Sequence, residues 1–269
     1  MGRQFIIFLD DAGTMTDPQR RAQQLRRAVG YFLSRHLGGG PAMWADAHDA
    51  VLAQLWDDYR QTMFGNVTAD YRAFRRRWLL GWVQGMYTHC GVQPPPVQVC
   101  LDLALRAEAY ATRQVRSAFP GAVEVIQTLA ARGHTLHTAS SEDSAELAGY
   151  LEGMGVRPCF GRLYGPNLIG TIKEGPPYYT RIFADAGVAP EQALVVDDSP
   201  LAIGWAAETG AWTARIGTPP GNWPAPDLQL ESLAQLPEAI RVLEDRPGTM
   251  RSTTVVPMQS TAEKPMRPM

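Results

Sequence analysis

The sequence predicts an α/β protein in which a Rossmann-like parallel sheet forms the core and an all-helical domain is inserted after the first strand. Residues 5–9 are five consecutive bulky apolar residues that end at Asp10 and a glycine turn. Such a run is typical of a short strand that is buried on both faces of a parallel sheet. A second unit of this kind, residues 193–196, ends in Asp197 and Asp198, whereas residues 17–117 show helical spacing almost throughout. These observations together predict the fold class.

The changes of pattern divide the chain into a core, an insertion and a tail. Residues 1–15 and 118–246 are predicted to form the Rossmann-like core, and residues 16–117 are predicted to form the helical domain. Residues 247–269 are rich in Thr, Ser, Pro, Met and Arg without periodicity, so we expect a disordered tail there.

The helical domain is predicted to begin at Asp17, because Asp accepts hydrogen bonds from free N–H groups and Pro18 tolerates the first turn. Apolar residues at helical spacing predict further helices around residues 51–63 and 71–82. The first helix should end at the glycines before Pro41, and three prolines at 94–96 precede a fourth helix over residues 97–117.

The alternation of strands and helices resumes after the insertion. A helix from Ala122 to about Arg132 and another from Pro177 to Ala186 are predicted between the strands, and residues 230–243 are expected to form a closing helix. The strands should form one parallel sheet with helices on both faces, joined by right-handed crossovers. They are predicted at residues 4–9, 135–138, 162–164, 193–196 and 211–216.

Composition excludes several classes of protein. The 269 residues carry a formal net charge of −2, which gives no electrostatic reason to expect nucleic acid or an anionic membrane as partner. The sequence has neither an apolar run of the ~20 residues that span a bilayer nor a signal-peptide pattern. Three widely spaced cysteines, Cys90, Cys100 and Cys159, are expected to be reduced thiols in a cytoplasmic protein.

Carboxylates at two strand ends predict a metal site. Asp10 follows the first strand and Asp197 with Asp198 follow a later one, and parallel strands bring their carboxyl ends to the same edge of a sheet. A cluster of carboxylates is costly unless a cation neutralises it or a proton is shared. We therefore expect Mg²⁺ at this edge.

Two further polar residues lie between these units in the chain. Thr138 comes at the end of a predicted strand, and Lys173 comes just before a predicted helix. Of the 25 basic residues only Lys173 and Lys264 are lysines. A compact ammonium fits a tight pocket between carboxylates better than the broad guanidinium that this chain uses elsewhere, so Lys173 is a candidate site residue.

The order Asp10, Thr138, Lys173 and Asp197–Asp198 resembles the four motifs of the haloacid dehalogenase-like hydrolase superfamily. The helical domain, inserted between the first and second motifs, resembles the mobile cap of the first cap class in that superfamily. The resemblance implies that Asp10 is the nucleophile, that Thr138 binds a phosphoryl oxygen and that Lys173 offsets negative charge.

The same resemblance implies a ligand set for the metal. Mg²⁺ would be bound by Asp10, by the backbone carbonyl of Ala12 and by Asp198, with Asp197 binding through water or supporting the other ligands. The implied activity is hydrolysis of a small phosphorylated or otherwise activated metabolite.

One position departs from the pattern. Phosphatases of the superfamily carry a second Asp, two residues after the nucleophile, as general acid and base, and this chain has Ala12 there. Asp11 is no substitute, because neighbouring side chains on an extended strand end point to opposite sides. Two alternatives therefore stay open: a carbon–halogen hydrolase, whose halide leaves without a proton, and a catalytically weak relative that binds Mg²⁺ and an anion.

The sequence does not name the substrate. In capped members of the superfamily the side chains of the cap close over the site and select the substrate. Trp44, Arg75, Arg76, Arg77 and Trp82 are candidates for such contacts.

Overall fold

The computed structural model describes residues 4–62 and 70–244, and these residues form a single six-stranded sheet in the order β3-β2-β1-β4-β5-β6. Every neighbouring pair of strands is parallel. The strands are β1 (Ile6–Leu9), β2 (Thr135–Ala139), β3 (Phe160–Tyr164), β4 (Ala193–Asp197), β5 (Trp212–Ile216) and β6 (Leu228–Leu230). The predicted fold class, a parallel Rossmann-like sheet with flanking helices, is confirmed.

Strand β1 lies in the middle of the sheet. Leu9 is in register with Thr138 of β2 on one side and with Val196 of β4 on the other. The pairing continues one residue further, since the backbone N–H of Asp10 donates to the carbonyl of Val196 at 2.9 Å. This register brings Asp10 to the same edge of the sheet as the end of β4.

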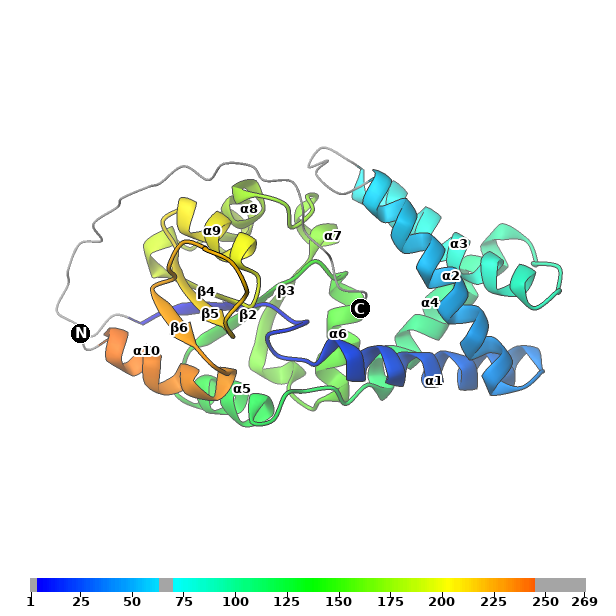
Figure 1. The fold of residues 1–269 in the computed structure, drawn as a ribbon, viewed down its shortest axis with the longest axis horizontal. Helices are drawn as coiled ribbons and strands as arrows, with labels where there is room; N and C mark the ends of the chain where they lie inside the picture. The colour runs from blue at the N-terminus through cyan, green and yellow to red at the C-terminus, as the bar shows by residue number, and fades with distance from the viewer. Residues whose placement is uncertain (1–3, 63–69, 245–269) are drawn as a thin grey trace.

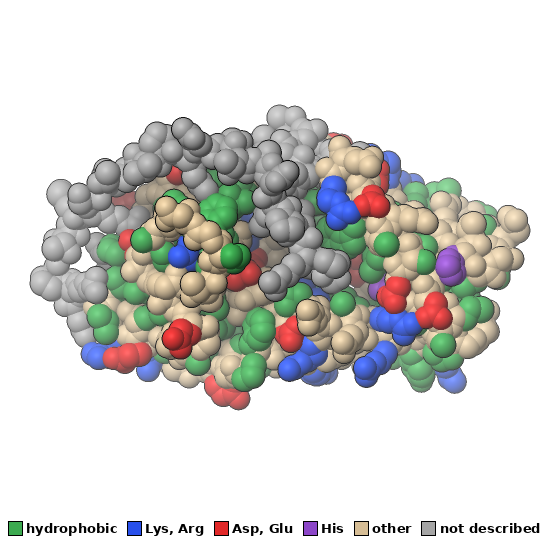
Figure 2. All heavy atoms as spheres, in the orientation of Figure 1, with side chains coloured by type: hydrophobic (Ala, Val, Ile, Leu, Met, Phe, Trp, Pro, Cys, Tyr) green, Lys and Arg blue, Asp and Glu red, His purple; other side chains and the backbone are tan. Residues whose placement is uncertain are grey.

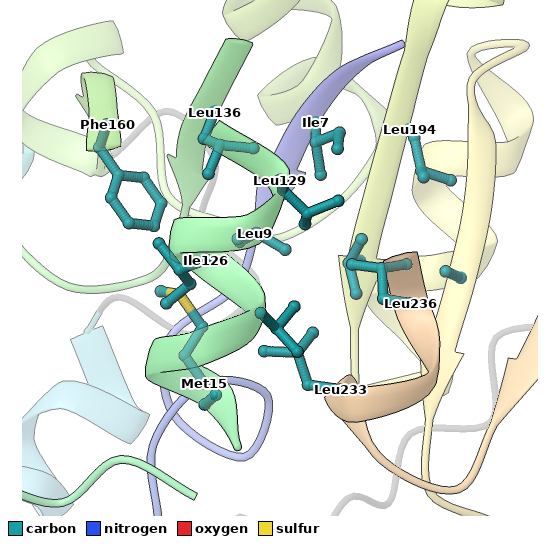
Figure 3. Packing of buried hydrophobic residues seen from close by; sticks show 14 of the residues in the cluster. Ile7, Leu9, Met15, Ile126, Leu129, Leu136, Phe160, Leu194, Leu233 and Leu236 are labelled. Atoms are coloured by element: carbon teal, nitrogen blue, oxygen red, sulfur yellow. The ribbon is translucent and has the colours of Figure 1, made fainter. Parts of the chain in front are cut away.

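Apolar side chains of β1 alternate between the two faces of the sheet, as the pleat requires. Ile7 and Leu9 point to one face and pack against helix α5 (Ala122–Ala131), which contributes Ile126 and Leu129 (Figure 3). Helices α6 (Ser144–Gly153) and α10 (Leu236–Glu244) complete this layer. Phe8 points to the opposite face.

That opposite face is covered by helices α8 (Pro176–Ala186) and α9 (Pro200–Glu208). Tyr179 and Phe183 of α8 pack with Phe8 and with Val195 of β4. A short helix, α7 (Pro166–Ile169), precedes α8. Because both faces are covered, the polar ends of the central strands are open only at the edge of the sheet.

The described residues between β1 and α5 form four helices beside the core (Figure 1): α1 (Pro18–Leu37), α2 (Pro41–Thr62), α3 (Tyr71–His89) and α4 (Val97–Gln114). They bury an apolar cluster of their own. Asp17 caps α1 as predicted, since its Oδ1 accepts from the N–H groups of Gln19 and Arg20 at 2.9 and 3.2 Å. The N–H of Asp17 donates to the carbonyl of Ser117 at 2.8 Å, so the entry and exit of this helical insertion are side by side.

Two predicted boundaries are wrong. Residues 230–243 do not form one helix, because Leu230 ends strand β6, a 3₁₀ turn follows at Leu233–Gln235, and α10 begins only at Leu236. A three-residue strand is too short to show alternation, so its two leucines could equally belong to a helix. The helix over 97–117 ends at Gln114, where Val115 turns to an extended conformation. Elsewhere the second helix begins earlier than its apolar pattern indicated, at Pro41.

The predicted tail, residues 247–269, lies outside the described residues. Within residues 4–62 and 70–244, no helix is both long and apolar enough to cross a membrane. The three cysteines are free thiols. On the face of the helical insertion shown in Figure 2, basic and acidic side chains lie close together. Within the insertion, Arg26 pairs with Asp49 at 2.6 Å.

Candidate active site

Three carboxylates meet at the carboxyl edge of the sheet. Asp10 follows β1, Asp197 ends β4, and Asp198 is the next residue. One carboxylate oxygen from each of the three lies within 4.8 Å of those of the other two. Asp10 and Asp197 are buried and Asp198 is half-buried, so the cluster is closed toward the core and accessible on the side of Asp198. The structure thus brings together the three acidic side chains that the sequence proposed as metal ligands.

Lys173 lies among these carboxylates. Its Nζ is 2.6 Å from Asp10 Oδ1, 2.6 Å from Asp197 Oδ2 and 2.7 Å from the carbonyl oxygen of Ala139. Nζ donates hydrogen bonds to Asp10 Oδ1 and to the carbonyl of Ala139, and its contact with Asp197 is an ion pair. Lys173 therefore fixes one oxygen of Asp10.

The electrostatics follow from burial and from the excess of negative charge. Burial raises the pKa of Asp10 to about 7 against the opposing effect of Lys173, and the charge of Asp197 raises it further. Burial likewise raises the pKa of Asp197. Burial alone would lower the pKa of Lys173, but Asp10 and Asp197 hold it well above its ordinary value. One ammonium thus faces three carboxylates.

This donor set fits a divalent cation with oxygen ligands. Carboxylate oxygens are the ligands that Mg²⁺ prefers in proteins. The positive charge of such an ion would also balance the negative charge of the carboxylates, which the single charge of Lys173 does not fully offset. Asp10, Asp198 and the backbone carbonyl of Ala12 would hold such an ion. Asp197 is already bound by Lys173 and by the N–H of Ser199, which donates to its Oδ1 at 2.8 Å.

The turn after Asp10 is shaped by Gly13. Its φ of +96° is rarely adopted by residues with a side chain, and a Cβ there would lie 2.5 Å from Asp198 Oδ2. The N–H of Gly13 donates to the carbonyl of Thr16 at 2.8 Å, which closes the turn. Asp198 can approach the turn only because residue 13 has no side chain.

Asp11 points away from the acidic cluster into a separate buried ion pair. Its Oδ2 lies 2.5 Å from Arg21 Nη2, and its Oδ1 accepts from the hydroxyl of Thr16 at 3.0 Å. Arg21 is also 3.2 Å from Glu142 Oε1, and its guanidinium lies 4.3 Å from the centre of the Tyr150 ring. Asp11 thus connects the first strand to the helical insertion, and its contacts are structural.

Thr138 lies inside β2, in register with Leu9, and is fully buried. Its hydroxyl donates to the carbonyl of Tyr164 at 3.2 Å, on the neighbouring strand. Ser140 is the first residue beyond β2, directly after the carbonyl that binds Lys173. Its Oγ accepts from the N–H of Glu142 at 3.2 Å. Ser140 is not among the site residues predicted from the sequence, and the signal that points to it is the exact end of the strand.

The candidate contacts from the helical insertion fall into two groups. Trp44 and Trp82 belong to the insertion's own core, with indole N–H groups that donate to the carbonyl of Gly38 at 2.8 Å and to His48 Nδ1 at 3.0 Å. Arg75 pairs with Glu108 of α4 and lies 3.4 Å from Glu146 of α6, so it joins the insertion to the core. Arg76 and Arg77 are exposed.

A parallel sheet that gathers three carboxylates and a lysine at its carboxyl edge, with a helical domain inserted after the first strand, defines the chain as a Rossmann-like α/β protein. The family profile of haloacid dehalogenase-like hydrolases matches residues 6–208. The chain belongs to this family, and the resemblance seen in the sequence is confirmed.

Relatives of known name carry different activities. A phosphoglycolate phosphatase of Rhodospirillum rubrum is 30% identical over 94 residues, a match that covers 35% of this chain and 39% of that protein. The L-2-haloacid dehalogenase of Xanthobacter autotrophicus superposes with a TM-score of 0.55 at 17% identity, covering 88% of this chain and 98% of that one.

A third protein with a similar structure was solved with magnesium. The hydrolase YfnB of Bacillus subtilis, bound to magnesium, gives a TM-score of 0.59 at 18% identity and covers 89% of this chain and 99% of that one. At these identities the superpositions show the fold alone. The curated phosphatase matches over much less than half of its length, so its substrate does not transfer with the similarity.

Proposed function

We propose that this protein is a Mg²⁺-dependent hydrolase of a small phosphorylated or otherwise activated metabolite, with Asp10 as nucleophile. The observation that carries the proposal is the cluster of Asp10, Asp197 and Asp198 around a single lysine. A carboxylate nucleophile divides one difficult displacement into two easier ones through a covalent ester. Carboxylates that can hold a metal cation, with a lysine beside them, are expected where an anionic phosphoryl group must approach an anionic nucleophile.

Asp10 is held for attack by its neighbours. Lys173 binds Oδ1, so Oδ2 is the oxygen that would attack phosphorus, forming an acyl phosphate while the bond to the leaving oxygen breaks. Water would then hydrolyse the acyl phosphate and restore the carboxylate. Lys173 stays protonated throughout and offsets charge on Asp10 and on the phosphoryl group.

Bound Mg²⁺, held by Asp10, the carbonyl of Ala12 and Asp198, would reduce the repulsion between carboxylate and phosphate and polarise the phosphoryl oxygen. Thr138 was the first candidate to bind that oxygen, but its hydroxyl donates to Tyr164. We assign the role to Ser140, whose hydroxyl accepts from Glu142 and retains its own proton for donation.

We further propose that the helical insertion acts as the cap of the site and that the protein works in the reducing cytoplasm, where its three free thiols would stay reduced. Contacts between the insertion and the core support the first proposal. Phe74 of α3 packs on Ile172, which directly precedes Lys173, and Arg75 reaches Glu146.

A carbon–halogen hydrolase is the second candidate, and Ala12 is the observation that favours it. Halide leaves without a proton, so that reaction needs no acid two residues after the nucleophile. It also needs no metal, which would leave Asp198 without a role at the site.

A substrate screen with and without Mg²⁺ tests the proposal. Phosphorylated metabolites, acetyl phosphate, aryl phosphates and 2-haloacids would be offered to the wild-type protein and to Asp10→Asn, in Mg²⁺ or in EDTA. We expect Mg²⁺-dependent release of phosphate by the wild type alone, with a trapped phosphoaspartate at Asp10. Halide release that is indifferent to EDTA would identify the second candidate. Mg²⁺ binding without turnover of any compound would indicate a weak, non-catalytic relative.

A further inference from the structure

The face that the helical insertion presents to the Lys173 loop is aromatic. Ile172 is buried and packs with Tyr71 and Phe74 of α3, and Tyr59 of α2 and Trp78 of α3 pack against the same cluster. The ring of Tyr59 lies 5.4 Å from that of Phe74, in an edge-to-face arrangement. Because Ile172 is the residue before Lys173, this cluster lies beside the candidate site.

Tyr59 and Tyr71 each contribute a phenol hydroxyl to this aromatic face, and Tyr59 is half-buried whereas Tyr71 is buried. Burial raises the pKa of the Tyr59 phenol, and the negative charges of Glu174 and Glu142 raise it further, so the group is a neutral donor. Glu174 follows Lys173, and Glu142 is two residues beyond Ser140. Through its packing on the cluster that contains Ile172, Tyr59 lies beside the loop that carries Lys173.

The buried cations between insertion and core are already paired. Arg21 binds Asp11 and Glu142, and Arg75 binds Glu108 and lies 3.4 Å from Glu146. A carboxylate on a substrate would thus meet carboxylates of the protein without a buried arginine left to receive it. Among the described residues of α3, Arg77 is an exposed alternative, with its guanidinium 6.0 Å from the centre of the Phe74 ring.

We propose that Tyr59 is a specificity-determining residue, which together with the aromatic cluster selects substrates with an uncharged aromatic leaving group and disfavours those that carry a carboxylate. This inference rests on the proposed function. An aromatic leaving group would stack on or against these rings and accept a hydrogen bond from the phenol. A leaving group with a carboxylate would be repelled by Glu174, two residues beyond Ile172.

A matched pair of esters tests the proposal. The 4-carbamoyl and 4-carboxy phenyl phosphates differ mainly in charge, and the rate for each would be normalised to its uncatalysed hydrolysis. We expect the wild type to prefer the carbamoyl ester by about 10-fold in kcat/KM. Glu174→Gln should reduce that preference.

Variants at Tyr59 separate selectivity from structure. Tyr59→Ala should lower kcat/KM for the carbamoyl ester about 10-fold, mainly through KM, and leave acetyl phosphate, which has no aromatic group, unchanged. Tyr59→Phe should lose less. Tyr31→Ala is the control, because Tyr31 is an exposed tyrosine of the insertion that stacks on Tyr110, 6.4 Å between ring centres.

Four results would overturn the proposal. Equal normalised rates for the two esters, with acetyl phosphate still hydrolysed, would refute the selectivity and leave the proposed function standing. Equal losses for acetyl phosphate and the carbamoyl ester in Tyr59→Ala would show a merely structural role. A preference for the carboxy ester that Arg77→Gln abolishes would assign selectivity to that arginine. If the wild type hydrolyses none of these esters in Mg²⁺, the proposed function fails as well.

Discussion

Lys173 Nζ lies 2.6 Å from Asp10 Oδ1, although the two residues are 163 positions apart in the chain. The ammonium donates a second hydrogen bond to the carbonyl of Ala139 and forms an ion pair with Asp197. One side chain thus connects the ends of three neighbouring strands, β2, β1 and β4. The ammonium favours the ionised form of the candidate nucleophile and fixes the orientation of its carboxylate.

Replacing this lysine by arginine should be nearly as harmful as removing the charge. The broad guanidinium cannot place three N–H groups on acceptors that all lie 2.6–2.7 Å from one atom. We expect Lys173→Arg and Lys173→Met each to lower kcat by about 10²-fold or more, the cost of one lost electrostatic donor. Steady-state kinetics checks this, with thermal unfolding as the control for folding. An arginine variant that keeps near wild-type kcat would show that only the charge matters.

The adjacent residues Asp10 and Asp11 should respond to substitution in opposite ways. Asp10→Asn keeps the shape of the side chain but removes the nucleophile, so turnover should vanish while the melting temperature stays close to that of the wild type. Asp11→Asn weakens the buried contact with Arg21, so we expect a loss of roughly 1–3 kcal/mol in the free energy of unfolding. The folded fraction should keep its kcat within about tenfold.

Kinetics and urea unfolding of both variants measure this contrast. Equal losses of turnover from the two substitutions would mean that the nucleophile has been assigned to the wrong residue.

Five of the six described strands and the acidic cluster were predictable from the sequence because they depend on local, strong signals, whereas the three-residue β6 was not. A run of five apolar residues that ends in Asp10 is fixed by burial on two faces, and the parallel connection brings Asp197 to the same edge. Lys173 was visible because the chain otherwise uses arginine almost everywhere.

Other features depend on details that a sequence pattern does not contain. The choice between Thr138 and Ser140 depends on where β2 ends, and boundaries are the least certain part of such a prediction. The partners of Arg75 come from two helices far apart in the chain, α4 and α6, so the sequence did not distinguish it from Arg76 and Arg77. Tyr59 owes its position beside Ile172 to packing between the insertion and the core.

Gly13 should be essential for metal binding. In Gly13→Ala the new Cβ would lie 2.5 Å from Asp198 Oδ2, so Asp198 must move. We expect the apparent affinity for Mg²⁺ to fall by about 10-fold or more, as it does when the supports of metal ligands are changed. Isothermal titration with Mg²⁺ measures this directly.

Gly155→Ala is the matched control. Gly155 also has a positive φ, +75°, but a Cβ there would meet no atom within 4 Å. Its substitution should cost a similar backbone strain and leave Mg²⁺ affinity unchanged. If both variants bind Mg²⁺ equally well, Mg²⁺ binding does not require Asp198 in the position that Gly13 permits.

His48 should make the helical insertion sensitive to acid. Its Nδ1 accepts from the indole N–H of Trp82 at 3.0 Å, and burial lowers the pKa of the imidazole to about 4. Between this value and the ordinary 6.5 the unfolded chain binds more protons than the folded one, so stability falls as the pH falls. The loss between pH 8 and pH 5 should be about 2 kcal/mol.

Urea unfolding of the wild type and of His48→Gln at both pH values checks this prediction. The glutamine keeps an acceptor for Trp82 but does not titrate, so its stability should fall less between pH 8 and pH 5. Parallel losses in the two proteins would assign the acid sensitivity to other groups.

Ala12 should make the rate depend on the leaving group. A methyl group two residues after Asp10 cannot donate a proton, so a leaving oxygen must depart as an anion unless another residue protonates it. Aryl and acyl phosphates, which leave as stable anions, should therefore turn over, and alkyl phosphates should be poor substrates. A plot of kcat/KM against the pKa of the leaving alcohol, over a series of phosphate esters, should show a steep decline.

Ala12→Asp should then restore a proton donor. General acid catalysis contributes about 10²–10⁴ in rate, and we expect the variant to recover at least 10-fold of this for alkyl phosphates while aryl phosphates change little. Ala12→Asn is the control, because the asparagine side chain has nearly the same volume as aspartate but cannot act as an acid. It separates the effect of proton donation from the effect of a larger side chain. If the wild type cleaves alkyl and aryl esters equally fast and Ala12→Asp has no effect, another side chain supplies the proton. Ala12 would then be a neutral replacement, because the chemistry that it lacks would be supplied from elsewhere in the site.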